Sequence, residues 1–348
     1  MTFYSLQQLG WRACFSQQLA CEELTASYPA RITAIHRNGL IALCEHGEQA
    51  LTVGSAAAEQ DLAVGDWLLV AHAAPRIVRV LERHSLVART AAGTEPRPQA
   101  IVANVDSLFI VLACTEDFSL SRLERYLALA FQAAVTPVIL LTKADLCSDA
   151  DAHLHAAQRV APHVAALAFD ATTAHCTELL QPWLGAGQTV ALVGSSGVGK
   201  STLVNSLLSC ATQVTAVTRA SDGTGRHTTS ARQLFAVPGG AWLIDTPGMR
   251  ELNIGAADAG VQAAFEDIAA LARTCRFRDC SHRGDAGCAV AVAVAEQRLD
   301  ERRLANYLKL QREVAHSTRT THERHAVERR FGRMFKARQE DLRKSRGR

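Results

Sequence analysis

The stretch GSSGVGKST, at residues 194–202, has the pattern G-x-x-x-x-G-K-[ST] of a phosphate-binding loop. It follows the apolar run TVALV and leads into the run STLVNSLLS, which predicts a strand before the loop and a helix after it. In this context, backbone N–H groups and the helix N-terminus surround the phosphates of a nucleotide. We expect Lys200 to act as a catalytic group that neutralises the β- and γ-phosphates, and the Ser201 hydroxyl to bind Mg²⁺. The loop residues assigned to nucleotide binding are Gly194, Ser195, Ser196, Gly197, Val198, Gly199, Lys200, Ser201 and Thr202.

The motif TKAD, at residues 142–145, ends the apolar run PVILL and matches the guanine-recognition pattern [NT]-K-x-D. A carboxylate at Asp145 can accept hydrogen bonds from N1–H and from the exocyclic amine of guanine, a pair of donors that adenine lacks. The alternative is that these residues only begin a helix. The run AFDAT, at 168–172, is a weaker candidate for a second guanine-contacting loop, because Asp170 stands where GTPases usually have Ser or Thr. The residues expected to bind the base of GTP are Thr142, Lys143, Ala144 and Asp145.

A third motif, in WLIDTPGMREL at 242–252, places Asp245 at the end of an apolar run and Gly248 three residues later. This D-x-x-G arrangement predicts that Asp245 holds Mg²⁺ through water and that the Gly248 N–H contacts the γ-phosphate as part of the catalytic site. The alternative is a simple turn. The polar run DGTGRHTTSA before it is typical of a switch loop, in which either Thr228 or Thr229 supplies a second hydroxyl to Mg²⁺.

The order of these motifs is unusual, because GTPases normally present the phosphate loop first and the guanine-recognition motif last. Apolar runs alternate with helical patterns from about residue 107 to 252, which predicts a parallel sheet with helices on both faces. In such a sheet the functional loops all leave the carboxyl edge, so the site depends on where the strands lie and not on their order along the chain. We therefore predict an α/β fold built on a circularly permuted P-loop GTPase domain at 96–255.

The region before this domain, at 1–95, is predicted to contain a small β-barrel. Short alternating runs lie between residues 31 and 89, and Asn38-Gly39 between two of them predicts a hairpin. An OB-fold is our interpretation, and a small SH3-like barrel would give much the same pattern. We expect GTEPRPQA, at 93–100, to be a linker, and the helix that follows the next strand to start with a capping box of Ser121 and Glu124.

Four metal-ligating residues cluster after the D-x-x-G motif with the spacing C-x4-C-x-H-x5-C. Three thiolates and one imidazole complete a tetrahedral zinc site without an open position, so one structural Zn²⁺ per chain is expected in a helical domain at 256–348. The alternative is unrelated cysteines beside a surface histidine. The expected zinc ligands are Cys275, Cys280, His282 and Cys288.

Composition limits the remaining possibilities. The chain has 348 residues, of which 48% are hydrophobic, so it can form two or three domains with buried cores. Its other cysteines are scattered singly, no apolar run is long enough to span a membrane, and the first residues lack a signal-peptide pattern. We expect a cytoplasmic protein. The net charge is +3, but residues 318–348 contain eleven Lys and Arg against four Asp and Glu, which suggests a polyanionic partner; a merely solvated helical face is the equally open alternative.

Taken in order, TKAD, GSSGVGKST, GRHTT, DTPG, the Cys/His cluster and the basic tail resemble the ribosome small subunit-dependent GTPase A family over nearly the whole chain. The resemblance implies an OB-fold, a permuted GTPase domain and a zinc domain. It also implies a role in late maturation of the small (30S) ribosomal subunit, with binding to its rRNA and with GTP hydrolysis to GDP stimulated by the subunit. A monomer without membrane contact is expected. The sequence departs from the family pattern at Asp170 and at Ser230, where the family often has a third Thr.

The group that orients the attacking water is not the usual one, since the position after D-x-x-G is Met249 instead of glutamine. His227 in the switch loop is the nearest candidate, and the resemblance implies the same catalytic role. The alternative is a solvated or RNA-facing histidine. An RNA-binding scaffold with a structural nucleotide is the alternative function. We favour turnover because Ser201, a switch threonine and Asp245 would complete the binding of Mg²⁺.

Overall fold

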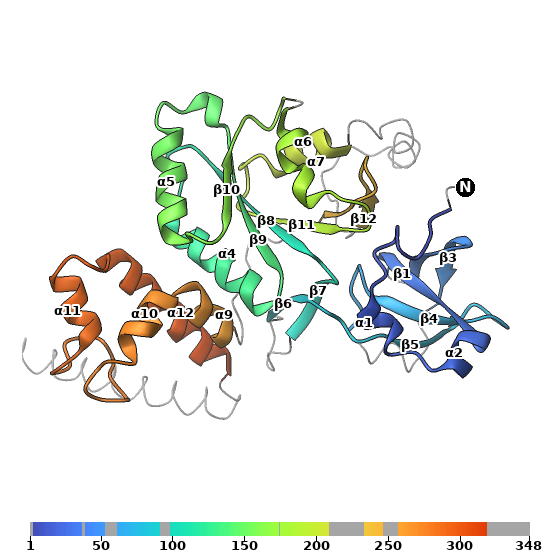
Figure 1. Ribbon diagram of the computed structural model, residues 1–348, viewed down its shortest axis with the longest axis horizontal. Helices are drawn as coiled ribbons and strands as arrows, with labels where there is room; N and C mark the ends of the chain where they lie inside the picture. Colours follow the sequence, from blue (N-terminus) through green and yellow to red (C-terminus); the bar gives the residue numbers. More distant parts are fainter. Residues whose placement is uncertain are drawn as a thin grey trace, which may run out of the picture.

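The computed structural model describes residues 3–36, 39–52, 61–90, 98–173, 175–208, 233–245 and 257–318. A central sheet with helices on both faces lies between an N-terminal group of strands and a C-terminal group of helices (Figure 1). This arrangement agrees with the layers of the predicted fold class, an α/β domain between a β-rich N-terminus and a helical C-terminus.

The N-terminal strands form an antiparallel group with its own core. Their order is β3-β2-β1-β4-β5, so β1 pairs on both of its edges. On each strand every second side chain points to the same face of the sheet. Ile32, Leu40 and Leu68, from three different strands, therefore meet in a common hydrophobic cluster. The elements are α1 (Ala13–Ser16), α2 (Cys21–Ala26), β1 (Ser27–His36), β2 (Gly39–Cys44), β3 (Gly47–Leu51), β4 (Trp67–Ala71) and β5 (Ile77–Val80).

The segment between these strands and the central sheet is itself paired. Strands β6 (Leu86–Thr90) and β7 (Pro98–Ala103) form an antiparallel two-stranded sheet, in which Thr90 lies opposite Pro98. The expectation of a linker at 93–100 was therefore wrong for its last three residues, which begin β7. Proline is tolerated there because it is the first residue of a strand.

The central sheet has the order β10-β9-β8-β11-β13-β12. The first five strands pair in parallel and β12 pairs antiparallel to β13. One residue pair, Ala34 opposite Gln233, joins β12 to β1 and so continues the sheet into the N-terminal strands. The elements are β8 (Ser107–Ala113), β9 (Thr136–Thr142), β10 (Ala165–Ala168), β11 (Thr189–Val193), β12 (Gln233–Ala236) and β13 (Trp242–Asp245).

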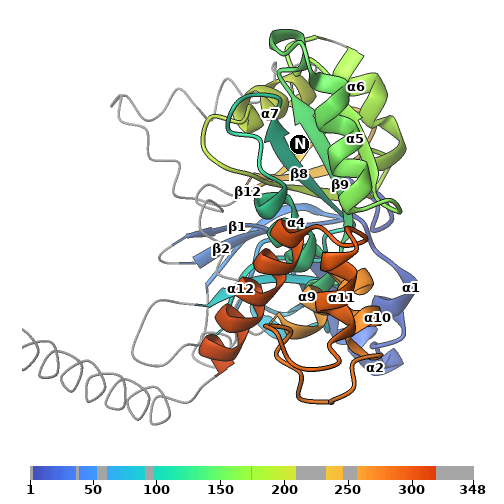
Figure 2. The same cartoon turned by 90° about the vertical axis from the view of Figure 1, so that its left-hand side faces the viewer.

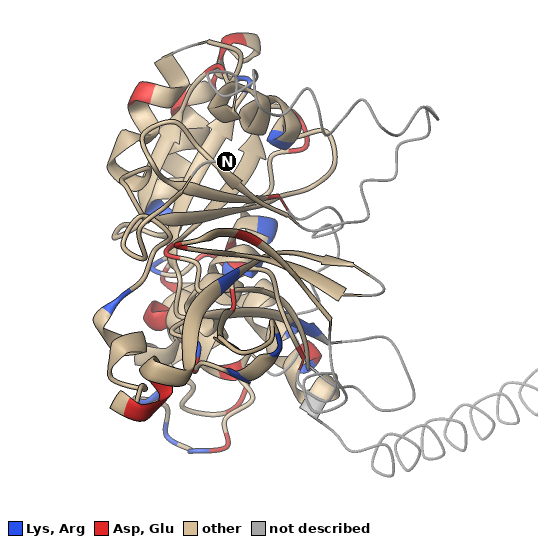
Figure 3. Cartoon of the chain, turned by 90° about the vertical axis from the view of Figure 1, so that its right-hand side faces the viewer, with Lys and Arg blue, Asp and Glu red and all other residues tan. Residues whose placement is uncertain are grey.

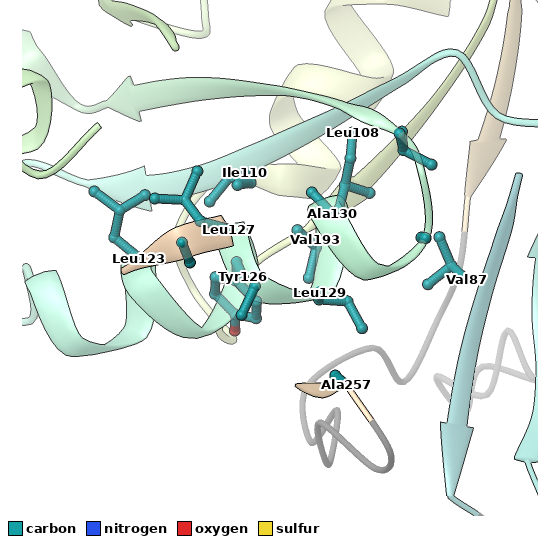
Figure 4. Packing of buried hydrophobic residues seen from close by; sticks show 14 of the residues in the cluster. Val87, Leu108, Ile110, Leu123, Tyr126, Leu127, Leu129, Ala130, Val193 and Ala257 are labelled. Atoms are coloured by element: carbon teal, nitrogen blue, oxygen red, sulfur yellow. The ribbon is translucent and has the colours of Figure 1, made fainter. Parts of the chain in front are cut away.

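Helices cover both faces of this sheet, which explains why every residue of β8 is buried. Leu108 and Ile110 pack with α4 and α5 on one face, whereas Phe109 and Val111 pack with α6 and α7 on the other. Figure 4 shows side chains of α4 against β8 and β11. The helices are α4 (Leu120–Gln132), α5 (Ala150–Val160), α6 (His175–Leu180) and α7 (Lys200–Leu208), with short 3-10 helices at Ala144–Leu146 and Gln181–Trp183.

Helix α4 begins differently from the prediction. Ser119 is its N-cap, and its side chain accepts a hydrogen bond from the Arg122 N–H at 3.4 Å. The predicted capping box of Ser121 and Glu124 is therefore wrong, because Ser121 already lies inside the first turn. The Glu124 side chain is fully buried and binds residues of the C-terminal helices instead.

The C-terminal helices pack beside α4, as Figure 2 shows. They are α9 (Asp258–Ala264), α10 (Glu266–Ala272), α11 (Ala289–Ala295) and α12 (Glu301–Thr318). Among the residues that the structure describes, no helix is long and apolar enough to cross a membrane.

A second attachment of the N-terminal strands lies at the amino end of the central sheet. Arg31 of β1 is buried there and donates to the Leu9 carbonyl oxygen at 2.6 Å and to the Thr189 hydroxyl, at the start of β11, at 2.8 Å. Burial lowers the pKa of Arg31 to about 10, so the guanidinium still carries its charge at neutral pH.

Candidate nucleotide site and metal centre

The predicted nucleotide motifs meet at the carboxyl edge of the central sheet. Thr142 ends β9, Val193 ends β11 directly before the phosphate loop, and Asp245 ends β13. Because β11 lies between β8 and β13, and β9 pairs with β8, the three loops leave neighbouring strands in the same direction. The permuted chain order therefore places the motifs at the edge where ligands of open α/β sheets bind.

Direct contacts join the guanine-recognition motif to the phosphate loop. The buried Thr142 hydroxyl donates to the Val198 carbonyl oxygen at 2.6 Å, and the Lys143 amine donates to the Gly197 carbonyl oxygen at 2.8 Å. Lys143 has a left-handed backbone, with φ of 57°, which turns the chain sharply after β9. The 3-10 helix that follows has no side-chain cap, which argues against helix capping as the role of these residues.

The phosphate loop approaches β8 so closely that a side chain is excluded at its first position. A Cβ on Gly194 would lie 2.3 Å from the Val111 carbonyl oxygen, so glycine is required there. The Lys200 amine donates to the Gly194 carbonyl oxygen at 2.6 Å and to that of Ser195. This places the ammonium group within the loop, where it can move to phosphate oxygens when a nucleotide binds.

Asp170 has a local role in its loop. Its carboxylate accepts hydrogen bonds from the Thr172 hydroxyl at 2.7 Å and from the Thr172 N–H at 2.8 Å. The hydroxyl and then the N–H of Thr172 lower the pKa of Asp170, so it remains ionised. The carboxylate thus stabilises its own turn after β10 instead of pointing away as a free charge.

Several predicted site residues lie outside the described part of the chain and stay predictions. They are His227, Thr228, Thr229 and Gly248, together with Met249, Ser230 and the basic tail beyond Thr318. One residue at the site was missed by the sequence analysis. Arg122 of α4 donates to the Ser195 hydroxyl of the phosphate loop at 2.9 Å, and no local pattern distinguishes it from other helix arginines.

The structure brings the predicted zinc ligands together between α10 and α11. Their four ligand atoms all lie within 4.8 Å of one another. The Sγ atoms of Cys275 and Cys288 are 3.9 Å apart, and Nδ1 of His282 lies 3.6 Å and 3.5 Å from these two atoms. Since Zn–S bonds are about 2.3 Å long, two thiolates on a tetrahedral zinc are about 3.8 Å apart. The donor set therefore fits a structural zinc ion.

Neighbouring groups hold these ligands in place. The Cys288 Sγ accepts a hydrogen bond from the Ala291 N–H at 3.3 Å, which caps the first turn of α11. The Asp285 carboxylate accepts bonds from the N–H and hydroxyl of Ser281, at 2.9 Å and 2.8 Å. Burial lowers the pKa of His282, which favours the neutral imidazole that a metal requires.

The position of Asp145 leads to a prediction about base choice. Replacing Asp145 by Asn removes a charged acceptor of two hydrogen bonds, so GTP binding is expected to weaken by about 2 to 4 kcal/mol. ATP binding should stay weak in both proteins. Titration with fluorescent guanine and adenine nucleotides measures both affinities, and equal binding of GTP and ATP by the unchanged protein would contradict the assignment.

Comparison with known proteins gives the context of this site. The sequence model of the RsgA GTPase family matches residues 80–255. A protein of Vibrio parahaemolyticus named small ribosomal subunit biogenesis GTPase RsgA 2 is 44% identical over 339 residues, which cover 97% of this chain and 94% of that protein. One of Mesorhizobium japonicum, named small ribosomal subunit biogenesis GTPase RsgA, is 45% identical over 317 residues, covering 90% of this chain and 91% of that protein.

Two solved structures are similar in fold. The crystal structure of YjeQ from Thermotoga maritima has a TM-score of 0.62 at 24% identity and covers 83% of this chain and 99% of its own. The structure of YloQ, described as a circularly permuted GTPase, has a TM-score of 0.59 at 21% identity and covers 84% of this chain and 96% of its own. The fold is thus shared with solved proteins, and the predicted fold class with its circularly permuted GTPase domain is confirmed.

Proposed function

The chain belongs to the RsgA GTPase family, and from this premise we propose that it hydrolyses GTP to GDP and phosphate on the small (30S) ribosomal subunit, in late maturation of that subunit. The observation that carries the proposal is the contact between the two motifs of the site. The Lys143 amine donates to the Gly197 carbonyl oxygen, which holds our candidate guanine-recognition loop against our candidate phosphate loop. The names of the relatives supply the small subunit as the partner.

The chemistry of turnover requires more than nucleotide binding. We infer that Ser201, Asp245 and one of the switch threonines hold Mg²⁺ on the phosphates, while Lys200 neutralises charge that develops on the γ-phosphate. His227 is our candidate for the group that orients water, because Met249 has no hydrogen-bond donor and its sulfur is only a weak acceptor.

The remaining parts of the chain suit binding to RNA. Figure 3 shows acidic and basic residues interspersed on one side of the molecule, whereas residues 318–348 carry a charge of +7, from eleven Lys and Arg and four Asp and Glu. We expect the basic segment to neutralise phosphates of rRNA. A zinc ion bound to the Cys/His cluster would fix the loop between α10 and α11. We propose that the protein acts as a monomer in the cytoplasm, with regions 1–95, 96–255 and 256–348 as its three domains.

The function is tested by measuring GTP turnover with and without purified small ribosomal subunits. We expect slow turnover by the protein alone, since the usual glutamine is replaced by Met249, and a clear stimulation by small but not large subunits. ATP in place of GTP is the control for specificity. Turnover that small subunits leave unchanged, together with tight subunit binding, would favour an RNA-binding scaffold in which the nucleotide is structural.

A further inference from the structure

The first turns of α4 contact the phosphate loop. The Arg122 guanidinium donates to the Ser195 hydroxyl at 2.9 Å through one nitrogen and to the Asp117 carbonyl oxygen at 3.0 Å through another. Asp117 belongs to the loop between β8 and α4. Arg122 therefore holds three segments together: the phosphate loop, the loop after β8, and the helix itself.

The same turns of α4 also hold the C-terminal helices. The Glu124 carboxylate is fully buried, and its oxygens accept hydrogen bonds from Arg303 at 2.9 Å, from Arg302 at 3.0 Å, and from Asn306 at 2.6 Å. All three donors lie on α12. Each carboxylate oxygen thus has at least one close partner from the C-terminal part of the chain.

Further contacts extend this connection along α4. Arg303 also binds the Asp267 carboxylate at 2.8 Å, which brings α10 into the same network. Arg125, one residue after Glu124, forms an ion pair with Glu313 at 2.8 Å. A Cβ on Gly260 of α9 would lie 2.0 Å from the Ala128 carbonyl oxygen, so α9 and α4 are in backbone contact.

These contacts make a sliding of α12 along α4 costly. Leaving a buried carboxylate without its cationic partners costs much more free energy than breaking an exposed ion pair. The C-terminal helices and α4 therefore move together or separate as a unit. Because Arg122 ties the same helix to Ser195, hydrogen bonds form a continuous path from the phosphate loop to the first residues of α12.

We propose that α4 connects the phosphate loop to the C-terminal helices, with Arg122 and Glu124 as the positioning residues of this connection. Nucleotide that orders Ser195 tightens the docking of α12, and docking of α12 in turn holds the loop ready for nucleotide. The inference rests on GTP binding alone and does not require the ribosomal subunit, so it can fail while the proposed function holds.

The experiment follows backbone hydrogen exchange in the full-length protein without nucleotide, with GDP, and with a saturating non-hydrolysable GTP analogue. In the unchanged protein the analogue is expected to slow exchange in α12 by about 5-fold or more relative to the nucleotide-free state, the lower end for coupled sites. Arg122→Ala should bind the analogue at saturating concentration but lose this slowing, and Arg122→Lys should restore part of it by keeping the charge near Ser195.

The reverse direction is tested with Glu124→Gln. This variant keeps the shape of the side chain and removes its charge. Because coupling is reciprocal, the dissociation constant of the analogue should rise in this variant. The expected factor equals the factor by which the analogue slows exchange of α12 in the unchanged protein. If this variant loses the helicity of α12, Arg125→Gln, which removes one partly exposed ion pair, takes its place. Arg298→Gln, which removes the exposed Arg298–Glu296 pair, is the matched control and should behave as the unchanged protein.

Three results would each overturn the proposal. Exchange in α12 that does not respond to the analogue in the unchanged protein would exclude coupling. Full slowing in Arg122→Ala would exclude the route through Arg122. An unchanged analogue affinity in both Glu124→Gln and Arg125→Gln would show that the contacts between α4 and α12 are structural only.

Discussion

Replacing Lys200 by Ala is expected to lower the kcat for GTP by at least roughly 10²-fold, the effect of removing one preorganised group that stabilises charge in a transition state. The Lys200 amine lies within the phosphate loop, 2.6 Å from the Gly194 carbonyl oxygen. Among the described residues, Arg122 and Lys143 also donate to the loop, but they belong to neighbouring segments. Lys200 is thus the cation that the loop itself supplies. In protein without Lys200, the charge on the γ-phosphate would be stabilised only by Mg²⁺ and by backbone N–H groups.

Single-turnover measurements at saturating GTP separate this effect from weaker binding. Lys309→Ala is the matched control, because it removes the same charge from an exposed position on α12. Ser201→Ala should lower turnover as well, and raised Mg²⁺ should recover part of that loss but none of the loss in Lys200→Ala. A Lys200→Ala protein with near-normal kcat would mean that the hydrolytic site lies elsewhere in the chain.

The meeting of the predicted nucleotide motifs at one edge of the sheet could be predicted from sequence because the signals of these motifs are local. Each motif is a short run with its own chemistry at the end of an apolar strand, and the sheet then brings the ends together. Circular permutation changes the order of the motifs along the chain but leaves each motif and its strand intact, so the motifs can still be recognised. The contacts of Lys143 with Gly197 and of Thr142 with Val198 follow from the same arrangement.

Glu124 shows where local signals mislead. Ser121 and Glu124 have the spacing of a capping box, and nothing nearby argues against it. The true partners of Glu124 lie 178 to 182 residues later in the chain, at Arg302, Arg303 and Asn306. A buried carboxylate takes the strongest charged donors that the tertiary structure offers, and these outweigh the single backbone N–H of a cap. Long-range ion pairs of this kind carry no sequence period.

The segment at 93–100 was misjudged for a related reason. Proline and glycine indicated a linker, yet Pro98 pairs opposite Thr90 as the first residue of β7. Pairing depends on the partner strand β6, whose own residues give only a short apolar signal. The clustering of the four predicted zinc ligands, in contrast, could be predicted from their spacing alone, because the geometry of a four-coordinate metal restricts the loop that can hold it.

Loss of zinc is expected to have the second large effect. Structural zinc binds to small zinc domains with an apparent free energy of about 10 to 16 kcal/mol. The free energy of unfolding of a whole protein has a similar size, about 5 to 15 kcal/mol. Cys280→Ala should therefore abolish binding of the expected one zinc per chain and unfold the loop between α10 and α11. Elemental analysis of freshly purified protein measures the metal, and hydrogen exchange locates the unfolding.

The unfolding should remain confined to part of the chain, since the zinc ligands contact the hydrophobic cluster on one face of the central sheet and not the cluster on the other face. Cys288 caps α11 and is buried in the hydrophobic cluster that includes α4, so α11 is expected to loosen together with the loop. The cluster on the other face of the sheet, around Phe109 and Leu203, contains no zinc ligand, and GTP binding should survive. Cys14→Ala, at an exposed cysteine, is the control and should keep both zinc and fold. Freshly purified protein without metal, or exchange in Cys280→Ala that spreads evenly through the phosphate loop and the C-terminal helices, would contradict a separate structural zinc site.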